Sequence, residues 1–261
     1  MSDPVLSVQA VTRRYGLPRR NLFAAAPVLT AVDNVSFDLA AGQTLGVVGE
    51  SGSGKSTLAR MVMGFERPDS GRILFQGQDI HRLATGDLQQ ARRRFQMVFQ
   101  DPFGSLDPRR RVGWSIAEPL RAMGETDTDA QVAEALEQVG LRAGHARSFP
   151  HEFSGGQRQR IAIARAIITR PALLVADEAV SALDVSVQAQ ILNLLMDIQD
   201  DLGLAILFIS HDLAVVSCVC DTLLVMQGGQ VLESGEVSGI LQDPGHDYTR
   251  TLLSAARLGV S

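Results

Sequence analysis

The order of apolar and polar residues predicts short strands that alternate with helices. Continuous apolar runs are typical of parallel strands that are buried on both faces. Such runs occupy residues 45–48, 172–176, 205–209 and 222–226. Shorter β-type runs close to turn glycines occupy residues 5–11, 35–39 and 73–75. We therefore expect a parallel sheet in the core and a small antiparallel sheet near the start of the chain.

The middle of the chain has a helical period instead. Residues 129–139, for example, place Val132, Leu136 and Val139 at helix spacing. This pattern extends over approximately residues 87–170 and predicts a helical subdomain inserted into the α/β core.

The C-terminal part contains a short β-type run at residues 231–233 and a helix-like segment at residues 248–257. With 261 residues, 45% of them hydrophobic, the chain can bury one large core. We interpret residues 1–261 as a single domain that ends in a short tail at residues 244–261.

The charge composition argues against a general nucleic-acid binder, because the net charge is −5 and such proteins usually carry a basic face. The arginine runs at residues 92–94 and 109–111 are local exceptions, and each can be a solvated surface or a binding patch. Apolar stretches all fall short of the ~20 residues that a membrane-spanning helix needs. We expect no membrane span in this chain.

The cysteine pair and the paired arginines near the start of the chain could each suggest another function. Cys218 and Cys220 form a C-x-C pair in an apolar run, which fits neither a disulfide framework nor a four-ligand metal site. We expect both to be core thiols in a reducing compartment. Paired arginines before residues 22–32 loosely resemble an export signal, but Pro27 interrupts that segment, so export is not expected.

One glycine-rich stretch carries a strong chemical signal. The sequence GESGSGKST matches the pattern G-x-x-x-x-G-K-[ST], and it lies between the predicted strand at residues 45–48 and a helix-like run at residues 58–63. Strand, glycine loop and helix in this order form a phosphate cradle, because backbone N–H groups and the helix N-terminus attract anions. Its members are Gly49, Glu50, Ser51, Gly52, Ser53, Gly54, Lys55, Ser56 and Thr57.

Lys55 is the one lysine among 24 Lys and Arg residues. A compact ammonium can follow the loop to the β- and γ-phosphates, whereas the broad guanidinium of arginine would crowd it. The hydroxyl of Ser56 is the expected Mg²⁺ ligand, and Thr57 is expected to contact phosphate. The loop therefore predicts a nucleoside triphosphate site.

A second acidic element follows the apolar run at residues 172–176. Asp177 is expected to hold Mg²⁺ directly or through water, and Glu178 is expected to polarise the attacking water as a general base. Taken alone, these two acids could be an ordinary strand end. Together with the glycine loop they predict nucleotide hydrolysis.

The stretch HEFSGGQRQRIAIARA, which contains Ser154, Gly155, Gly156 and Gln157, precedes this acidic element. With it the chain resembles the ATP-binding cassette (ABC) ATPases. The resemblance implies a P-loop NTPase core of the ABC ATPase fold, with a small antiparallel β subdomain and a helical subdomain. It also implies ATP and Mg²⁺ as ligands. In that family the SGGQ signature binds the γ-phosphate of ATP held by a partner subunit, so a dimer is expected.

The resemblance assigns roles to further residues. Gln100 resembles the Q-loop glutamine, which senses Mg²⁺ and the attacking water and couples to a membrane partner. Asp184 resembles the D-loop aspartate at the dimer interface, and His211 resembles the switch histidine that contacts the γ-phosphate. Tyr15 resembles the aromatic residue that stacks on adenine, with Phe23 as its rival.

Longer stretches point to a subfamily. VGESGSGKSTLAR, QMVFQDPFGSLDPR and GHDYTRTLLSA resemble the ATPase subunits of bacterial dipeptide, oligopeptide and nickel importers. Departures from the usual pattern are Phe153 in place of leucine, Ala179-Val180 in place of Pro-Thr or Pro-Val, and His246-Asp247-Tyr248 in place of His-Pro-Tyr. Both carboxylates of the acidic element remain in place.

This subfamily resemblance implies that the protein is located peripherally at the cytoplasmic face of the bacterial inner membrane. The expected partners are a second cassette, identical or paralogous, permease subunits docked around Gln100 and residues 107–111, and indirectly a solute-binding protein. Peptide is the first expected solute and nickel the second, and no nucleic-acid partner is expected. The rivals are a soluble ABC protein acting on DNA or ribosomes and a simple P-loop kinase, which would leave SGGQ unexplained.

Overall fold

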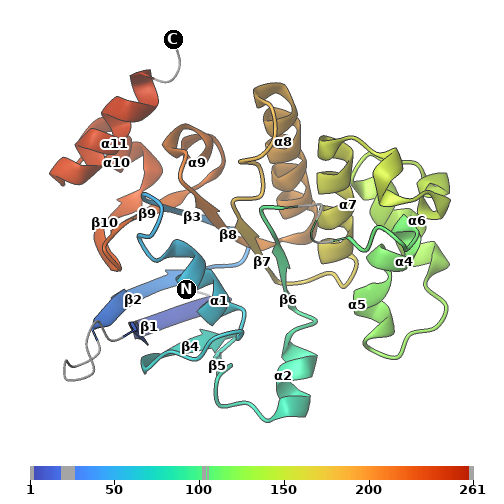
Figure 1. Ribbon diagram of the computed structural model, residues 1–261, viewed down its shortest axis with the longest axis horizontal. Helices are drawn as coiled ribbons and strands as arrows, with labels where there is room; N and C mark the ends of the chain where they lie inside the picture. The colour runs from blue at the N-terminus through green and yellow to red at the C-terminus, as the bar shows by residue number, and fades with distance from the viewer. Residues whose placement is uncertain (1–2, 19–26, 102–103, 105, 259–261) are drawn as a thin grey trace. The chain divides into compact units, whose positions relative to one another are not determined.

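The computed structural model describes residues 3–18, 27–101, 104 and 106–258 (Figure 1). The chain divides into two compact units. The first consists of Met1–Leu88 and Leu207–Ser261, and the second of Gln89–Ile206. Helix α2 (Thr85–Ala91) and strand β8 (Ala205–Ser210) run through the points where the chain passes from one unit to the other.

The first unit contains an antiparallel sheet near the start of the chain. Its order is β2-β1-β4-β5, and the strands are β1 (Leu6–Gly16), β2 (Val28–Leu39), β4 (Ser70–Phe75) and β5 (Gln78–Asp79) (Figure 1). The strands are longer than the apolar runs that predicted them. Residues Arg13 to Gly16 continue β1 because each pairs with a residue of β2, a ladder that the local polarity did not reveal.

The same unit holds strands that lead to the glycine loop. Strand β3 (Thr44–Val48) is wholly buried, as its apolar run predicts, and it pairs in parallel with β9 (Thr222–Gln227). Strand β10 (Gln230–Glu236) pairs antiparallel with β9. The helices here are α1 (Lys55–Val62), α9 (Leu213–Val219), α10 (Val237–Gln242) and α11 (Asp247–Leu258).

The prediction that both cysteines are core thiols is wrong for Cys218, which is exposed on α9. Val216 is fully buried, and a residue two positions further along lies about 200° around the helix axis from it. Cys220 is half-buried beside Gly46 of β3, and burial raises the pKa of its thiol. Both thiols are free.

The second unit combines two parallel strands with helices. Strand β6 (Phe95–Val98) pairs with β7 (Leu173–Asp177) in a register that sets Val98 beside Ala176. The helices are α4 (Val112–Ile116), α5 (Glu118–Arg121), α6 (Asp129–Gln138), α7 (Gly155–Ile167) and α8 (Val185–Leu202), with short 3₁₀ turns at Ala143–Arg147 and Pro150–Glu152.

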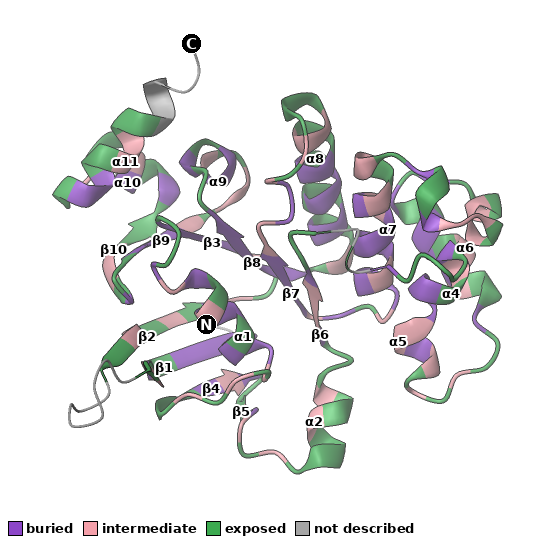
Figure 2. Ribbon diagram, in the orientation of Figure 1, coloured by how far each residue is buried: buried purple, intermediate pink, exposed green. Residues whose placement is uncertain are grey.

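Helix α7 is the centre of the helical packing in this unit, since it contacts α4, α5, α6 and α8. Its apolar residues Ile161, Ile163 and Ile167 are nearly inaccessible to solvent. Figure 2 shows buried and exposed residues on different sides of α8, as expected for an amphipathic helix. Within the described parts of the chain, every helix is too short or too polar to cross a membrane.

Candidate nucleotide site

The glycine loop joins β3 to α1, and close backbone contacts fix its conformation. Gly54 has a φ of 107°, and a Cβ atom added there would lie 2.2 Å from the carbonyl oxygen of Ala31. A Cβ atom on Gly49 would lie 2.1 Å from the carbonyl oxygen of Met226. Contacts of this length exclude any side chain. From the sequence, these glycines were expected because they let backbone N–H groups face a phosphate. In the structure they are also required by close contacts with β2 and β9.

Lys55 lies inside this loop, with only 4% of its surface exposed. Its Nζ donates hydrogen bonds to the carbonyl oxygens of Gly49 at 2.6 Å and Glu50 at 2.9 Å, and lies 3.5 Å from the hydroxyl oxygen of Ser53. An ammonium has three donors and no acceptor, which matches this set of oxygens. The loop is therefore closed around the group that is expected to meet the phosphates.

Helix α1 begins at Lys55 with Gly54 as its N-cap, and among the described residues no side chain caps it. A glycine at the N-cap has no side chain that could compete with an anion for the N–H groups of the first turn. Ser56 is exposed and Thr57 is half-buried in that turn, while Glu50, Ser51 and Gly52 are exposed on the loop. The predicted Mg²⁺ ligand and phosphate contacts thus lie at one helix end.

Tyr15 and His211 also belong to the first unit, but they lie outside the glycine loop and helix α1. Tyr15 is the second-last residue of β1, donates its hydroxyl to the carboxylate of Glu66, and has the guanidinium of Arg13 at 4.9 Å from its ring centroid. A base stacked on this ring would use the face away from Arg13. Phe23, the rival, lies outside the described residues. His211 is exposed and follows β8 directly.

The acidic element of the second unit ends β7. Asp177 and Glu178 are both half-buried, and Glu178 has a left-handed backbone with a φ of 50°. The backbone N–H and the hydroxyl of Ser181 both donate to the carbonyl oxygen of Glu178, at 3.1 and 3.0 Å. Ala179 and Val180 are buried at 2% exposure each, so these departures from the family pattern pack inward.

Gln100 belongs to the same edge as this acidic element. Strands β6 and β7 are parallel neighbours with Val98 beside Ala176, and Gln100 and Asp177 follow these two residues along the chain. Because parallel strands end at a common edge, the two side chains leave adjacent strand ends. Gln100 is exposed there.

The SGGQ signature forms the N-terminus of α7. Ser154 is the N-cap, and its hydroxyl accepts from the N–H of Gln157 at 3.4 Å while the Gln157 side-chain oxygen accepts from the N–H of Ser154 at 3.0 Å. This is a capping box. It was not predicted, although the spacing of serine and glutamine before an apolar helix is its sequence signal.

Asp184, the predicted D-loop aspartate, precedes a helix whose first turn packs against the signature. Asp184 is the N-cap of α8, and hydrogen bonds from the Ser186 hydroxyl and the Val187 N–H hold its pKa below the usual range. A Cβ atom on Gly156 would lie 2.4 Å from Cγ1 of Val187, so glycine is required for the two helix ends to meet. The structure thus brings the signature and the D-loop together.

The comparison with protein families identifies this architecture. The family described as ABC transporter matches residues 32–181, which include the glycine loop, the signature and the acidic element. The chain belongs to the ABC transporter family.

The sequence of this ABC chain is similar to those of named proteins. It is 51% identical over 257 residues to the glutathione import ATP-binding protein GsiA of Salmonella choleraesuis, and 51% identical over 256 residues to GsiA of Escherichia coli. Each match covers 97% of this chain and 41% of the relative. The chain therefore spans about two fifths of the length of these curated relatives.

Solved ABC structures share the fold. The cbiO1 protein of Clostridium perfringens, described as part of the transporter complex cbiONQ, has a TM-score of 0.80 at 26% identity and covers both chains completely. The ATP-binding cassette MJ0796, solved as a dimer in a post-hydrolysis state with ADP and Pi, has a TM-score of 0.77 at 25% identity over 89% of this chain and 98% of its own. These matches confirm the predicted ABC ATPase fold.

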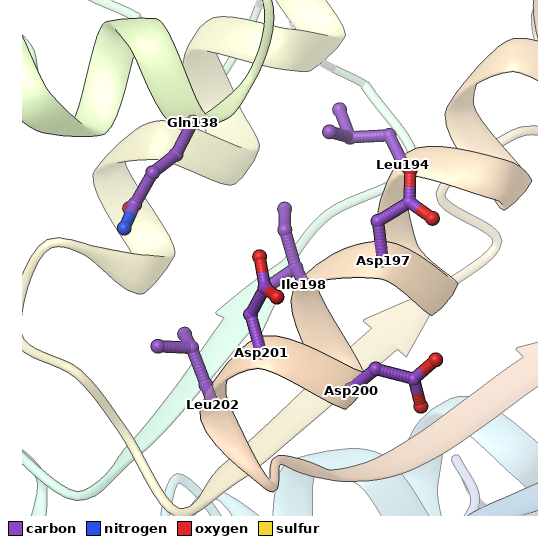
Figure 3. A pocket seen from close by; sticks show the side chains of 7 residues that line it. All are labelled: Gln138, Leu194, Asp197, Ile198, Asp200, Asp201 and Leu202. Carbon is purple, nitrogen blue, oxygen red and sulfur yellow. The ribbon is translucent and has the colours of Figure 1, made fainter.

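A separate pocket of about 460 Å³ in the second unit of this ABC chain is lined by Gln138 and by the C-terminal turns of α8 (Figure 3). Its carboxylates belong to Asp197, Asp200 and Asp201, and Figure 3 shows Asp200 directed away from the other two. Among the described residues no acidic, His or Cys cluster could hold a metal ion. Negative charge at a helix C-terminus repels a triphosphate, so this pocket is not a nucleotide site.

Proposed function

We propose that this chain is the ATP-hydrolysing cassette of a multi-subunit membrane importer. One observation carries the proposal: a glycine loop closed around a buried lysine and followed directly by a helix N-terminus whose N-cap is a glycine. Helix-end N–H groups and a compact ammonium are the groups that bind the end of a triphosphate chain. The name of the GsiA relatives, which are ATP-binding proteins, supports the same reading.

The residues present fit Mg²⁺ as the accompanying ion. Ser56, Gln100 and Asp177 offer hydroxyl, amide and carboxylate oxygens, which are the hard donors that Mg²⁺ prefers. Bound Mg²⁺ would neutralise part of the charge on the β- and γ-phosphates. These three residues are the ones that we expect to hold it.

Hydrolysis follows from the remaining side chains. Glu178 takes a proton from the attacking water as its general base, and His211 donates toward the γ-phosphate as negative charge develops there. Lys55 and the N–H groups of the loop hold the phosphates in place during this step.

The signature acts on a second molecule in this proposal. Ser154–Gln157 presents the N-terminus of α7 at the surface, with Gly155 and Gly156 leaving its backbone accessible to an anion. Two cassettes facing each other would place each signature against the ATP bound by the other. The dimeric state recorded for MJ0796 supports this arrangement.

The transported solute is proposed to be a peptide, because the named relatives import glutathione, which is itself a short peptide. Nickel or another small solute is the second candidate. The cassette would sit peripherally at the cytoplasmic face of the bacterial inner membrane, on permease subunits served by a solute-binding protein.

The permease surface is proposed to lie around Gln100 and residues 107–111. Trp114 is 39% exposed just beyond this segment, with the guanidinium groups of Arg110 and Arg121 at 4.7 and 4.4 Å from its ring. An exposed aromatic ring between two arginines is typical of protein interfaces. This surface would transmit closure of the cassettes to the permease.

Mixing two inactive variants tests the shared site. Lys55→Ala removes the phosphate lysine, and Gly155→Asp places a negative charge at the signature, where an added Cβ would lie 3.7 Å from Leu183 and therefore fits. Each variant alone should be inactive. In a mixed dimer one site combines an intact loop with an intact signature, so an equal mixture should recover about a quarter of wild-type ATP turnover.

The measurement is steady-state phosphate release at a fixed total chain concentration, with each variant first shown to be folded by circular dichroism. Turnover in the mixture that stays at the level of the single variants would contradict a site shared between two copies.

A further inference from the structure

The C-terminal helix α11 contacts the glycine loop through one side chain. The backbone N–H of Glu50 donates a hydrogen bond of 3.0 Å to the hydroxyl oxygen of Tyr248, which is 198 residues away in the sequence. Tyr248 is only 8% exposed, whereas Glu50 is exposed, so the bond is partly buried. Its stretch, GHDYTRTLLSA, has no role in the function proposed above.

This hydrogen bond involves the Gly49–Glu50 peptide unit, which also binds Lys55. The N–H of Glu50 and the carbonyl of Gly49 belong to the same planar peptide unit, and in a trans peptide they point in opposite directions. That carbonyl oxygen accepts from Nζ of Lys55 at 2.6 Å. Tyr248 on one side and Lys55 on the other therefore fix the orientation of this peptide.

Helix α11 is itself fastened to the sheet. The carboxylate of Glu233 on β10 accepts from the N–H of Gly245 at 2.7 Å and from the N–H of His246 at 3.3 Å. Burial alone would raise the pKa of Glu233, but the nearby Thr249 side chain and the hydrogen bonds from the N–H groups of Gly245 and His246 hold it below the usual range. The carboxylate is thus kept ionised at the N-terminal end of α11, where the helix dipole favours negative charge.

The anchor and the loop lie at the same level of the sheet. Glu233 is paired with Val225 of β9, and Val225 is paired with Val48, the residue that precedes Gly49. The start of α11 is therefore held at the level where the glycine loop leaves β3. From there Tyr248 reaches Glu50.

We propose that Tyr248 is a positioning residue for nucleotide binding, a role that rests on the ATP site proposed above. Its hydroxyl sets the Gly49–Glu50 peptide, and through it Lys55, before the triphosphate arrives. Binding to a loop that is already ordered loses less conformational entropy, so affinity is higher. The C-terminal helix thereby becomes part of the phosphate site without touching phosphate.

The test removes one oxygen atom. Tyr248→Phe keeps the ring in its buried position and deletes the acceptor of the Glu50 N–H. We expect the dissociation constants of ATP and of inorganic tripolyphosphate to rise by the same factor, about fivefold for one lost hydrogen bond. Amide hydrogen exchange in peptides covering residues 49–57 should become faster. The midpoint of thermal unfolding should stay within about 2 °C.

Two further variants make the result specific. Ser254→Ala deletes a hydroxyl of the same helix that donates to the carbonyl of Arg250, and it should change neither affinity nor exchange. Glu233→Gln should weaken affinity in the same direction as Tyr248→Phe. The double variant should be no weaker than the poorer single variant, since both changes act through one contact.

Unchanged tripolyphosphate affinity and unchanged exchange of the loop in Tyr248→Phe would overturn the proposal. So would a uniform rise in exchange over the whole first unit, because it would show general loosening of the fold. If the wild-type chain itself bound no ATP, the proposed function would fail, and the exchange of residues 49–57 would still decide whether Tyr248 positions the loop.

Discussion

Lys55→Ala should lower ATP affinity by about a hundredfold or more, the largest single effect that we expect on binding. When ATP binds, Nζ would exchange contacts within the loop for charge-assisted hydrogen bonds to phosphate oxygens, each of about 1.5–3 kcal/mol, and two of them correspond to at least that factor. The variant also leaves the carbonyl groups of Gly49 and Glu50 without the ammonium that now holds them. Titration calorimetry with ATP measures the change.

A matched control is available on the same helix. Arg60→Ala removes an exposed cation of α1 that pairs with Glu66 at 3.6 Å, and it should leave ATP affinity within about twofold, as expected for a surface ion pair. Lys55→Arg should bind nearly as poorly as Lys55→Ala, because a guanidinium does not fit a loop closed around an ammonium. Wild-type affinity in Lys55→Ala would show that the loop does not hold phosphate through this lysine, and wild-type affinity in Lys55→Arg would show that a guanidinium fits the loop.

Glu178→Gln should preserve ATP binding and lower the rate of hydrolysis by about 10²–10⁴-fold, the range for removal of a general base. The substitution keeps the size and the hydrogen-bonding reach of the side chain. It also leaves the backbone turn intact, because the bonds from Ser181 go to the carbonyl oxygen of residue 178. Single-turnover phosphate release, together with ATP titration, separates the two effects.

Glu137→Gln is the corresponding control, since it makes the same chemical change at an exposed position of α6. Its phosphate release should equal that of the wild type. Near-normal release from Glu178→Gln would remove Glu178 from its proposed role and would point to another base.

The features that the sequence predicted well are those whose signals are local. The glycine loop could be predicted between a buried apolar strand and a helix because all three lie close together in the sequence, between Thr44 and Val62. The motif itself requires that context. The same holds for the acidic pair at the end of β7 and for the buried strand β9.

The features that it missed depend on residues far apart in the chain. The outer part of β1 forms a strand because it pairs with β2, and Gly156 is required because Val187 of α8 packs against it. The contact of Tyr248 with Glu50 likewise has no local signal. Cys218 was misplaced for a related reason, since an apolar run does not reveal which side of a short helix faces the core.

A structure of the Glu178→Gln chain with bound ATP and Mg²⁺ would show directly whether two copies share each nucleotide. We expect two copies and two nucleotides, each triphosphate lying between Gly49–Thr57 of one copy and Ser154–Gln157 of the other. A triphosphate bound away from the glycine loop, or a signature directed away from every nucleotide, would contradict it.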